Sequence, residues 1–130
     1  MQTKTKTNVE YLTTDAMKGL PFSEAVRVGD MLYLSGKLGT DSSGKVVPGG
    51  IAAETRQTME NIKSALERCG SSLNHVVKAT VMLADMNEWA EMNTVYVTYF
   101  TDHLPARSAM GVNGLARGAR VEIEVIAVVN

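Results

Sequence analysis

Alternation of apolar and polar residues predicts β-strands in several parts of the chain. These segments lie at 25–36, where Gly29-Asp30 separates two strand pieces, and at 76–85, 106–113 and 120–129. The last segment becomes apolar on both faces towards its end, which is typical of a central strand covered on both sides.

Two segments have helical periodicity. In the first, at residues 51–69, small and apolar side chains recur at intervals of three and four, and Gly70 supplies a stop signal. The second begins after Asp85, which with Glu88 has the spacing of a capping box, and Pro105 ends it. Its apolar stripe contains Trp89, Met92, Tyr96, Tyr99 and Phe100, with Asn93 near the middle of the stripe.

The order of these elements predicts one α+β domain over residues 1–130, with a mixed six-stranded sheet and two helices on one face. Two helices cannot cover both faces of such a sheet. We therefore expect a homo-oligomer in which another copy of the chain covers the second face.

Charge and composition exclude several classes of partner. The net charge is −1 and the pI is about 6.1, so no basic field attracts nucleic acid. No apolar run approaches the length of a membrane span, and the N-terminal segment does not resemble a signal peptide. The single cysteine, Cys69, fits a reducing compartment, and we expect a cytoplasmic protein.

Motifs for nucleotide or metal binding are absent, and the glycines of GVNGLARG have the wrong spacing for a dinucleotide turn. His75 and His103 lie in unrelated segments and are expected to be surface or loop residues, so no metal site is predicted. Cys69 is expected to pack against the core.

A small set of polar residues remains as candidate chemistry: Arg107, Glu122, Asn93 and the pair Ser35-Gly36. Arg107 stands among small residues on a strand. It either binds a ligand or forms a cross-strand salt bridge with Glu122 or Glu124, within one chain or at a subunit interface, and the two alternatives have equal weight. Taken singly, the other residues are better explained structurally. Glu122 would be a charge at a strand edge, Asn93 a tether from helix to loop, and Ser35-Gly36 a strand ending in a turn.

Taken together, these residues stand in motifs that resemble the Rid (reactive intermediate deaminase) family, also called the YjgF or L-PSP endoribonuclease-like family. The resemblance rests on LYLSG at 32–36, PARS at 105–108 and VEIEVIAVV at 121–129. The helical phrases at 54–70 and 78–93 match in pattern, and the resemblance extends from about residue 20 to the end.

The resemblance implies a chorismate-mutase-like (YjgF-like) fold and a homotrimer with three sites in the clefts between subunits. It also implies hydrolysis of reactive 2-imino acids, such as 2-iminobutanoate and 2-iminopropanoate, to 2-oxo acids and ammonia without a cofactor. Such an activity protects the cell from imine damage.

The family's site residues fall on matching positions of this chain. Arg107 would hold the substrate carboxylate, Glu122 would position the attacking water, and Ser35, Gly36 and Asn93 would line or support the pocket. Two positions depart from the family's pattern: Ala109 replaces a common cysteine, and Phe22 replaces a common tyrosine. Main-chain groups at Ala109 can still contact the imine, whereas Phe22 removes one hydroxyl group.

Two other functions remain open at this point. A non-catalytic trimeric module that binds small carboxylates, such as a metabolite sensor or a chaperone-like protein, would use the same arginine. Glu122 opposes this alternative because a carboxylate weakens anion binding. Endoribonuclease activity is disfavoured by the balanced charge.

Overall fold

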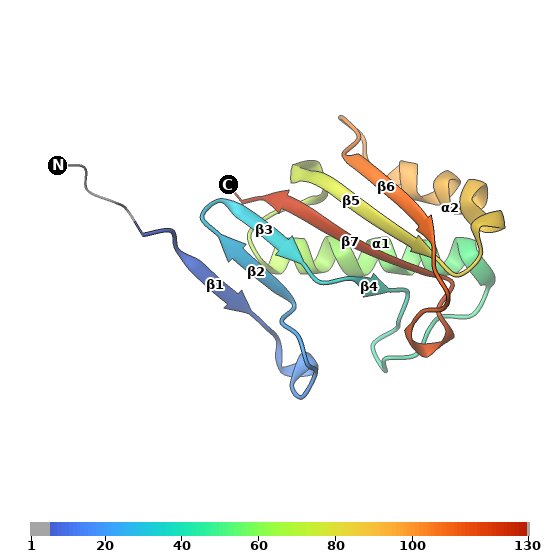
Figure 1. The fold of residues 1–130 in the computed structure, drawn as a ribbon, viewed down its shortest axis with the longest axis horizontal. Coiled ribbons are helices and arrows are strands. Elements are labelled where there is room, and N and C mark those ends of the chain that lie inside the picture. The colour runs from blue at the N-terminus through green and yellow to red at the C-terminus, as the bar shows by residue number, and fades with distance from the viewer. Residues whose placement is uncertain (1–5, 130) are drawn as a thin grey trace.

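Residues 6–129 are described by the computed structural model, in which the strands join one seven-stranded sheet (Figure 1). The strands are β1 (Val9–Leu12), β2 (Ala25–Val28), β3 (Met31–Leu34), β4 (Lys37–Leu38), β5 (Val76–Leu83), β6 (Ala106–Gly111) and β7 (Val121–Val128). The helices are α1 (Gly50–Arg68) and α2 (Trp89–Tyr96), and short 3-10 turns are η1 (Asp15–Met17), η2 (Leu73–His75), η3 (Met86–Glu88), η4 (Val97–Tyr99) and η5 (Ala116–Gly118).

Strand order in the sheet is β1-β2-β3-β7-β5-β6, and β4 pairs with β7 beside β3. The β5–β6 pair is parallel and the other pairs are antiparallel, which confirms the expected mixed sheet with a central last strand. The sheet has seven strands in place of the six expected. The two-residue β4 lies in a run of turn residues and has no periodicity of its own, and β1 follows a polar N-terminal segment.

The predicted turn at Gly29-Asp30 joins β2 to β3 as a two-residue hairpin, since Val28 pairs directly with Met31. Gly29 has a φ of 57°, the left-handed conformation that such tight hairpin turns require and that glycine adopts without steric cost.

Helix α1 buries the face that its periodicity predicts. Its buried side chains are Ile51, Glu54, Thr55, Thr58, Met59, Ile62, Ala65 and Leu66. Gly70, with a φ of 83°, follows the helix and confirms the predicted stop.

The second helical region differs from its prediction in three details. The first is its end, because α2 stops at Tyr96 and the 3-10 turn η4 at Tyr99, before Pro105. Asp85 caps it as expected, because its side chain accepts a hydrogen bond of 2.9 Å from the main-chain N–H of Asn87. Glu88 does not complete a capping box, since its carboxylate binds Arg120 instead. Trp89 is part of the predicted apolar stripe, yet 44% of it is exposed at the first position of α2.

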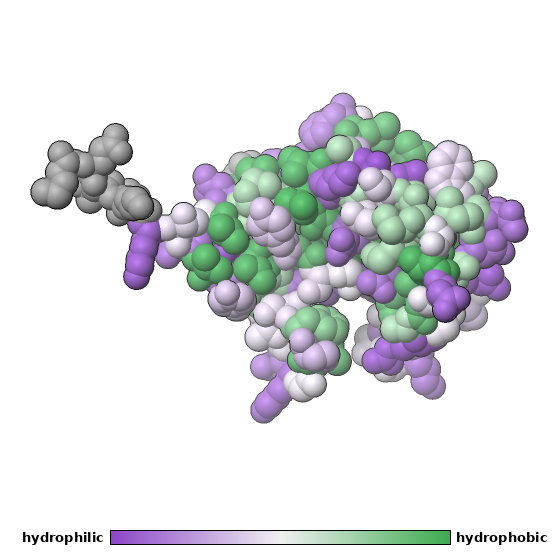
Figure 2. All heavy atoms as spheres, viewed as in Figure 1, coloured by the Kyte–Doolittle hydropathy of each residue, from purple (hydrophilic) through white to green (hydrophobic). Residues whose placement is uncertain are grey.

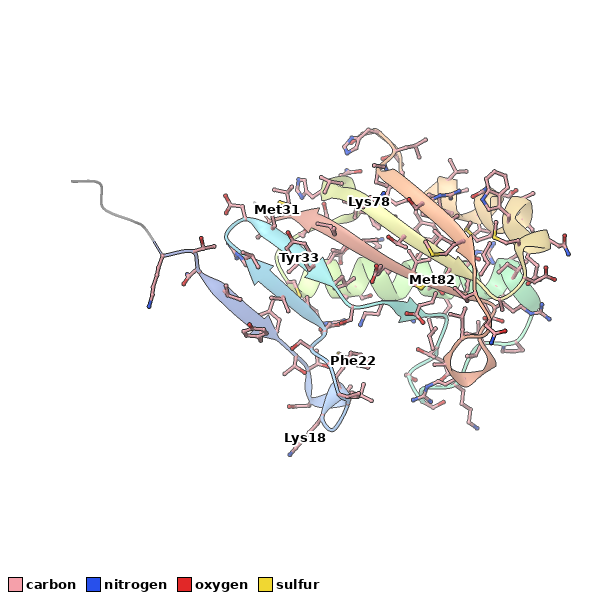
Figure 3. All side chains as sticks on the ribbon, in the orientation of Figure 1. Lys18, Phe22, Met31, Tyr33, Lys78 and Met82 are labelled. Carbon is pink, nitrogen blue, oxygen red and sulfur yellow. The ribbon has the colours of Figure 1, made fainter. Side chains whose placement is uncertain are left out.

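Both helices lie behind the sheet in Figure 1, and they cover one face. On that face Leu32, Val81 and Ile123 are fully buried. The opposite face, towards the viewer in Figure 3, presents Met31, Tyr33, Lys78 and Met82. Figure 2 shows hydrophobic and hydrophilic side chains interspersed on this side of the molecule. The single chain thus leaves open the face that the sequence predicts to need a cover.

Among residues 6–129, neither helix combines the length and the hydropathy that crossing a membrane demands.

Candidate active site

Arg107 extends from the edge strand β6 towards helix α2. Its Nη1 donates a hydrogen bond of 2.7 Å to Oδ1 of Asn93, and its Cζ lies 4.9 Å from the ring centroid of Tyr96 and 5.9 Å from that of Trp89. Trp89, Asn93 and Tyr96 follow one another at intervals of four and three residues, so they share one face of α2. The aromatic rings favour the cation electrostatically, and the amide fixes one edge of the guanidinium.

This geometry limits the alternatives for Asn93 and Arg107 within one chain. Asn93 does not tether the helix to a loop, because its carbonyl oxygen binds the Arg107 side chain. Arg107 pairs in register with Ala79, which is buried beneath the helices, so both side chains point to the helical face. Glu122 and Glu124 alternate with the buried Ile123 and point to the open face. A salt bridge between Arg107 and these carboxylates within one chain is therefore excluded.

Glu122 lies near the start of β7, paired with Met82 of β5 and Leu38 of β4. Partial burial raises the pKa of its carboxyl group, and the charge of Glu124 raises that pKa further. The carboxyl group is thus held so that it takes up a proton at a higher pH than an ordinary glutamate.

Gly36 makes room for the Glu122 carboxylate. A Cβ atom at residue 36 would lie 2.2 Å from Oε2 of Glu122, which is much closer than atoms in contact can approach. The adjacent Ser35 donates a hydrogen bond of 2.6 Å from its hydroxyl group to the main-chain carbonyl of Ser23. This hydrogen bond connects the end of β3 to the segment that contains Phe22.

Phe22 directly precedes Ser23 in the loop that leads into β2, and 49% of it is exposed (Figure 3). Ser35, Gly36 and Glu122, together with this loop, make one group of candidate residues, which we call the carboxylate half-site. Ala109 lies two residues after Arg107 on the same face of β6 and packs against the core. Arg107, Asn93 and Ala109 make the second group, the arginine half-site.

The sequence motifs therefore resolve into two half-sites on opposite faces of one sheet. Within a single chain, the arginine half-site faces α2 and the carboxylate half-site faces the open side. The sequence motifs contain the members of both groups, but they do not indicate that the two groups lie on different faces of the sheet. Trp89 and Tyr96 were not predicted as neighbours of Arg107, because their spacing from Asn93 indicates only that the three residues share a face of α2.

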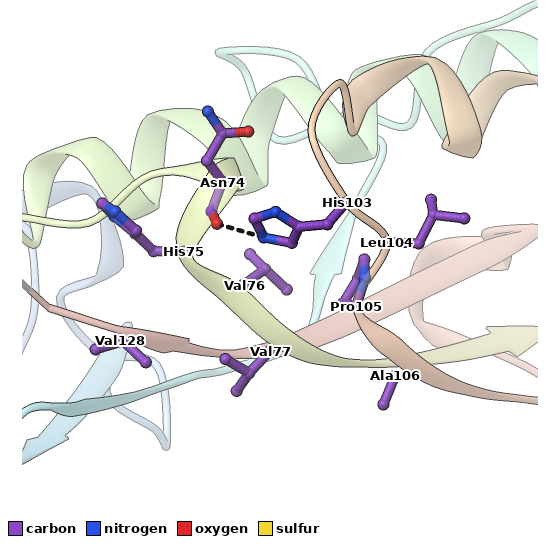
Figure 4. Close-up of a pocket in the computed structure, with 9 residues that line it drawn as sticks. All are labelled: Asn74, His75, Val76, Val77, His103, Leu104, Pro105, Ala106 and Val128. Carbon is purple, nitrogen blue, oxygen red and sulfur yellow. Dashed lines mark hydrogen bonds between the residues drawn. The ribbon is translucent and has the colours of Figure 1, made fainter.

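A separate hollow lies near the beginnings of β5 and β6 (Figure 4). It measures about 390 Å³ and includes His75 and His103 in its lining, but neither Arg107 nor Glu122. His103 donates from Nε2 to the carbonyl oxygen of Asn74 over 2.8 Å, and Nδ1 of His75 lies 3.1 Å from the hydroxyl oxygen of Ser72. Both histidines thus have local structural partners.

Metal ligands do not cluster in the described residues, where no three histidine, cysteine or acidic side chains converge. Cys69 packs at the margin of the core, and burial raises the pKa of its thiol, aided by the charge of Glu24. A thiol held in its protonated form is a poor nucleophile and a poor metal ligand.

Comparison with known proteins gives a consistent result. Residues 13–129 match the model of the family described as endoribonuclease L-PSP. The chain is 50% identical over 109 residues to the mouse 2-iminobutanoate/2-iminopropanoate deaminase, which covers 83% of this chain and 81% of the mouse protein. A RutC family protein of Pyrococcus horikoshii is 46% identical over 108 residues, or 82% of this chain and 86% of that protein.

Solved structures match over almost the whole chain. RidA from an Antarctic Psychrobacter has a TM-score of 0.85 at 38% identity and covers 92% of this chain and 99% of its own. The YjgF gene product of E. coli has a TM-score of 0.83 at 34% identity and covers 92% and 98% of the two chains.

Proposed function

Because the chain belongs to the endoribonuclease L-PSP family, whose curated relatives include imine deaminases, we propose that it hydrolyses reactive 2-imino acids to 2-oxo acids and ammonia. The substrates are of the 2-iminobutanoate and 2-iminopropanoate type. The observation that carries the proposal is Arg107, a guanidinium held by Asn93 and aromatic rings at the edge of the sheet, with no carboxylate of its own chain as partner among the described residues.

Arg107 binds the carboxylate of the substrate. With Nη1 committed to Asn93, the remaining N–H groups of the guanidinium can donate two parallel hydrogen bonds to a carboxylate, which fixes the orientation of the adjacent C=N bond. Such positioning supplies a large part of the acceleration when the uncatalysed reaction is already fast.

Glu122 orders and activates the attacking water. The water oxygen bonds to the imine carbon while its proton passes to the carboxylate, and the nitrogen takes up a proton to give an amino alcohol. A second proton on nitrogen lets ammonia leave with the C–N electron pair, and loss of the hydroxyl proton gives the ketone. The raised pKa of Glu122 suits a group that alternately accepts and donates protons. The reaction balances with water alone, so no cofactor is required.

The complete site is proposed to lie between copies in a homotrimer. One copy supplies the arginine half-site, and its neighbour supplies the carboxylate half-site. The opposite orientations of Arg107 and Glu122 in one chain support this arrangement, as does the open sheet face with exposed Tyr33 and Met110. A heterologous contact that closes after three copies repeats the same pairing of half-sites three times.

The replaced family positions are compatible with this chemistry. Main-chain groups at Ala109 can contact the imine whatever the side chain. Losing a tyrosine hydroxyl at Phe22 removes one hydrogen bond, worth about 1 kcal/mol. We expect a change in rate, not in reaction.

A cytoplasmic location without nucleic acid or membrane partners is part of the proposal. The single cysteine suits a reducing compartment, and a net charge of −1 provides no attraction for a phosphate backbone.

The first test generates 2-iminobutanoate in situ from threonine and a dehydratase and follows its loss with and without the protein. Arg107→Ala removes the charge-assisted hydrogen bonds to the substrate, so we expect kcat/KM to fall about a hundredfold. Arg56→Ala, an exposed arginine on α1, is the matched control. Full activity in Arg107→Ala would refute the assignment.

Glu122→Gln separates the enzyme from a non-catalytic module that binds small carboxylates. The enzyme loses turnover while it still binds 2-oxobutanoate, whereas a binding module keeps or improves its affinity and has no turnover to lose.

A further inference from the structure

Trp89 is a large, half-exposed side chain beside Arg107. It begins α2, 44% of it is exposed, and its ring centroid lies 5.9 Å from Cζ of Arg107. A tryptophan exposed to this extent leaves a large apolar surface in contact with water, next to the group that binds the substrate carboxylate.

The other neighbours of the guanidinium already hold it in position. Asn93 accepts its hydrogen bond, and the ring of Tyr96 lies 4.9 Å from Cζ. Tyr96 is 5% exposed and packs against Phe100, with 5.0 Å between ring centroids, so it belongs to the core. Trp89 lies farther from Cζ than Tyr96 does, and its exposed surface is available for contact with a ligand.

The residues that follow Arg107 on its face of β6 are small. Ala109 shares the face of β6 with Arg107, and Gly111 lies two residues further along the same face. Met86 covers Gly111 closely, since a Cβ at residue 111 would lie 2.7 Å from its Cγ. Glu88, which directly precedes Trp89, is turned towards Arg120, the residue before β7.

The distances match the size of an amino-acid-derived ligand. A carboxylate bound to the guanidinium through hydrogen bonds of about 2.8 Å extends its next carbon atoms a few ångströms beyond Cζ. The indole, at 5.9 Å from the same atom, is thus within van der Waals reach of the side-chain carbons of a 2-imino acid.

We propose that Trp89 is the residue that recognises the substrate's side chain and that the protein prefers 2-imino acids with larger apolar side chains to 2-iminopropanoate. The inference rests on the proposed function, because it names the substrate class of the same site. Burial of each additional methylene group against the indole strengthens binding in the transition state.

Fluorescence provides a test that does not depend on turnover. Trp89 is the single tryptophan of the chain, so its emission reports contact at this one position. Titration with two stable products, 2-oxobutanoate and 2-oxo-4-methylpentanoate, should change the emission in a saturable manner, with the larger acid binding several-fold more tightly. Arg107→Ala should abolish the change.

Kinetics provide the second test. Imines derived from alanine and from leucine are generated in situ by an amino-acid oxidase, and kcat/KM is measured for each. Trp89→Ala should lower kcat/KM for the leucine-derived imine about tenfold and that for the alanine-derived imine less than about twofold. Trp89→Phe should restore most of the difference, and Val97→Ala, a side chain of similar exposure beyond α2, should leave both values unchanged.

The possible results distinguish the role of Trp89 from the proposed imine hydrolysis. Wild-type protein that accelerates no imine would refute the proposed function itself. Active wild-type protein whose substrate preference is unaltered in Trp89→Ala would refute only the role of Trp89. An equal loss for both imines, or a loss of assembly on size-exclusion chromatography, would assign Trp89 a structural role and overturn the inference.

Discussion

At the scale of single residues, Arg107 owes its position to α2 more than to its own strand. Asn93 fixes one nitrogen of the guanidinium and Tyr96 lies beneath it, so a free edge remains for an anion. Helical periodicity alone indicates that Trp89, Asn93 and Tyr96 share a face. It could not indicate that an arginine from residue 107 meets that face, because this depends on the parallel pairing of β5 and β6.

Gly36 provides a test of the carboxylate half-site without altering any ionisable group. In Gly36→Ala the new methyl group overlaps Oε2 of Glu122, so the carboxylate must move from its position near β4. A displacement of this kind is expected to lower kcat about a hundredfold with a smaller change in KM. Steady-state kinetics measure this, with Gly19→Ala as a glycine control in open space, where the positive φ is the one source of strain.

The pH profile should carry the signature of Glu122. Its raised pKa means that the carboxylate becomes protonated, and activity falls, at a higher pH than for an ordinary glutamate with a pKa of about 4.3. Glu124→Gln removes the like charge and should move the acid limb of kcat/KM to lower pH. The change should be less than half of the rise in the pKa of Glu122, because burial is the larger cause of that rise. An acid limb that does not move in Glu124→Gln, or one that moves equally in the exposed control Glu67→Gln, would contradict this assignment.

At the scale of elements, α1 joins distant parts of the sheet through its two ends. Near its start the buried Glu54 accepts a hydrogen bond of 2.8 Å from the main-chain N–H of Arg120, which leads into β7. At its end Arg68 binds the buried Glu24, which precedes β2 and also receives a bond of 3.3 Å from Lys37. The helix thus anchors both the central strand and the hairpin.

Loss of the second anchor should be measurable. Arg68→Ala leaves the buried Glu24 carboxylate with Lys37 as its remaining cation, and we expect the free energy of unfolding to fall by about 2 kcal/mol. Urea denaturation at one fixed protein concentration measures the change, because assembly contributes to apparent stability. Glu67→Ala, the exposed neighbour, should stay within about 0.5 kcal/mol of the wild type.

The boundaries of helices and strands were predicted correctly where the end of the hydrophobic periodicity coincides with a turn or stop residue such as glycine. The hairpin at Gly29 and the end of α1 at Gly70 are of this kind, because each glycine has a positive φ that marks a break in regular structure. Glu88 illustrates the limit. Its spacing from Asp85 favours a capping box. In the structure, however, the carboxylate of Glu88 binds Arg120, which lies 32 residues further along the chain.

At the scale of the whole molecule, the two faces of the sheet separate the predicted site residues. The sequence predicts that Arg107 and Glu122 belong to one site, and alternation along each strand could have assigned each residue to a face of the sheet. It could not relate the two faces, since that requires the register across β5, β6 and β7.

A shared site predicts that two inactive variants can complement each other. Arg107→Ala and Glu122→Gln are mixed, exchanged by unfolding and refolding, and assayed. In a head-to-tail trimer about a quarter of the sites then receive both native residues, and activity returns to about that fraction. Failure to recover activity in verified mixed trimers would indicate that each site draws both residues from one copy, and the double variant alone serves as the inactive baseline.

The central position of β7 also affects the order in which the protein can be made and folded. Strands β3 and β5 do not pair with each other, since β7 lies between them. While residues 121–128 are still unsynthesised, a nascent chain therefore exposes the edges of two separate strand groups, which are open to pairing with other chains. The sheet cannot close before residues 121–128 are available, so insertion of β7 between the two strand groups is expected to be the step that completes folding.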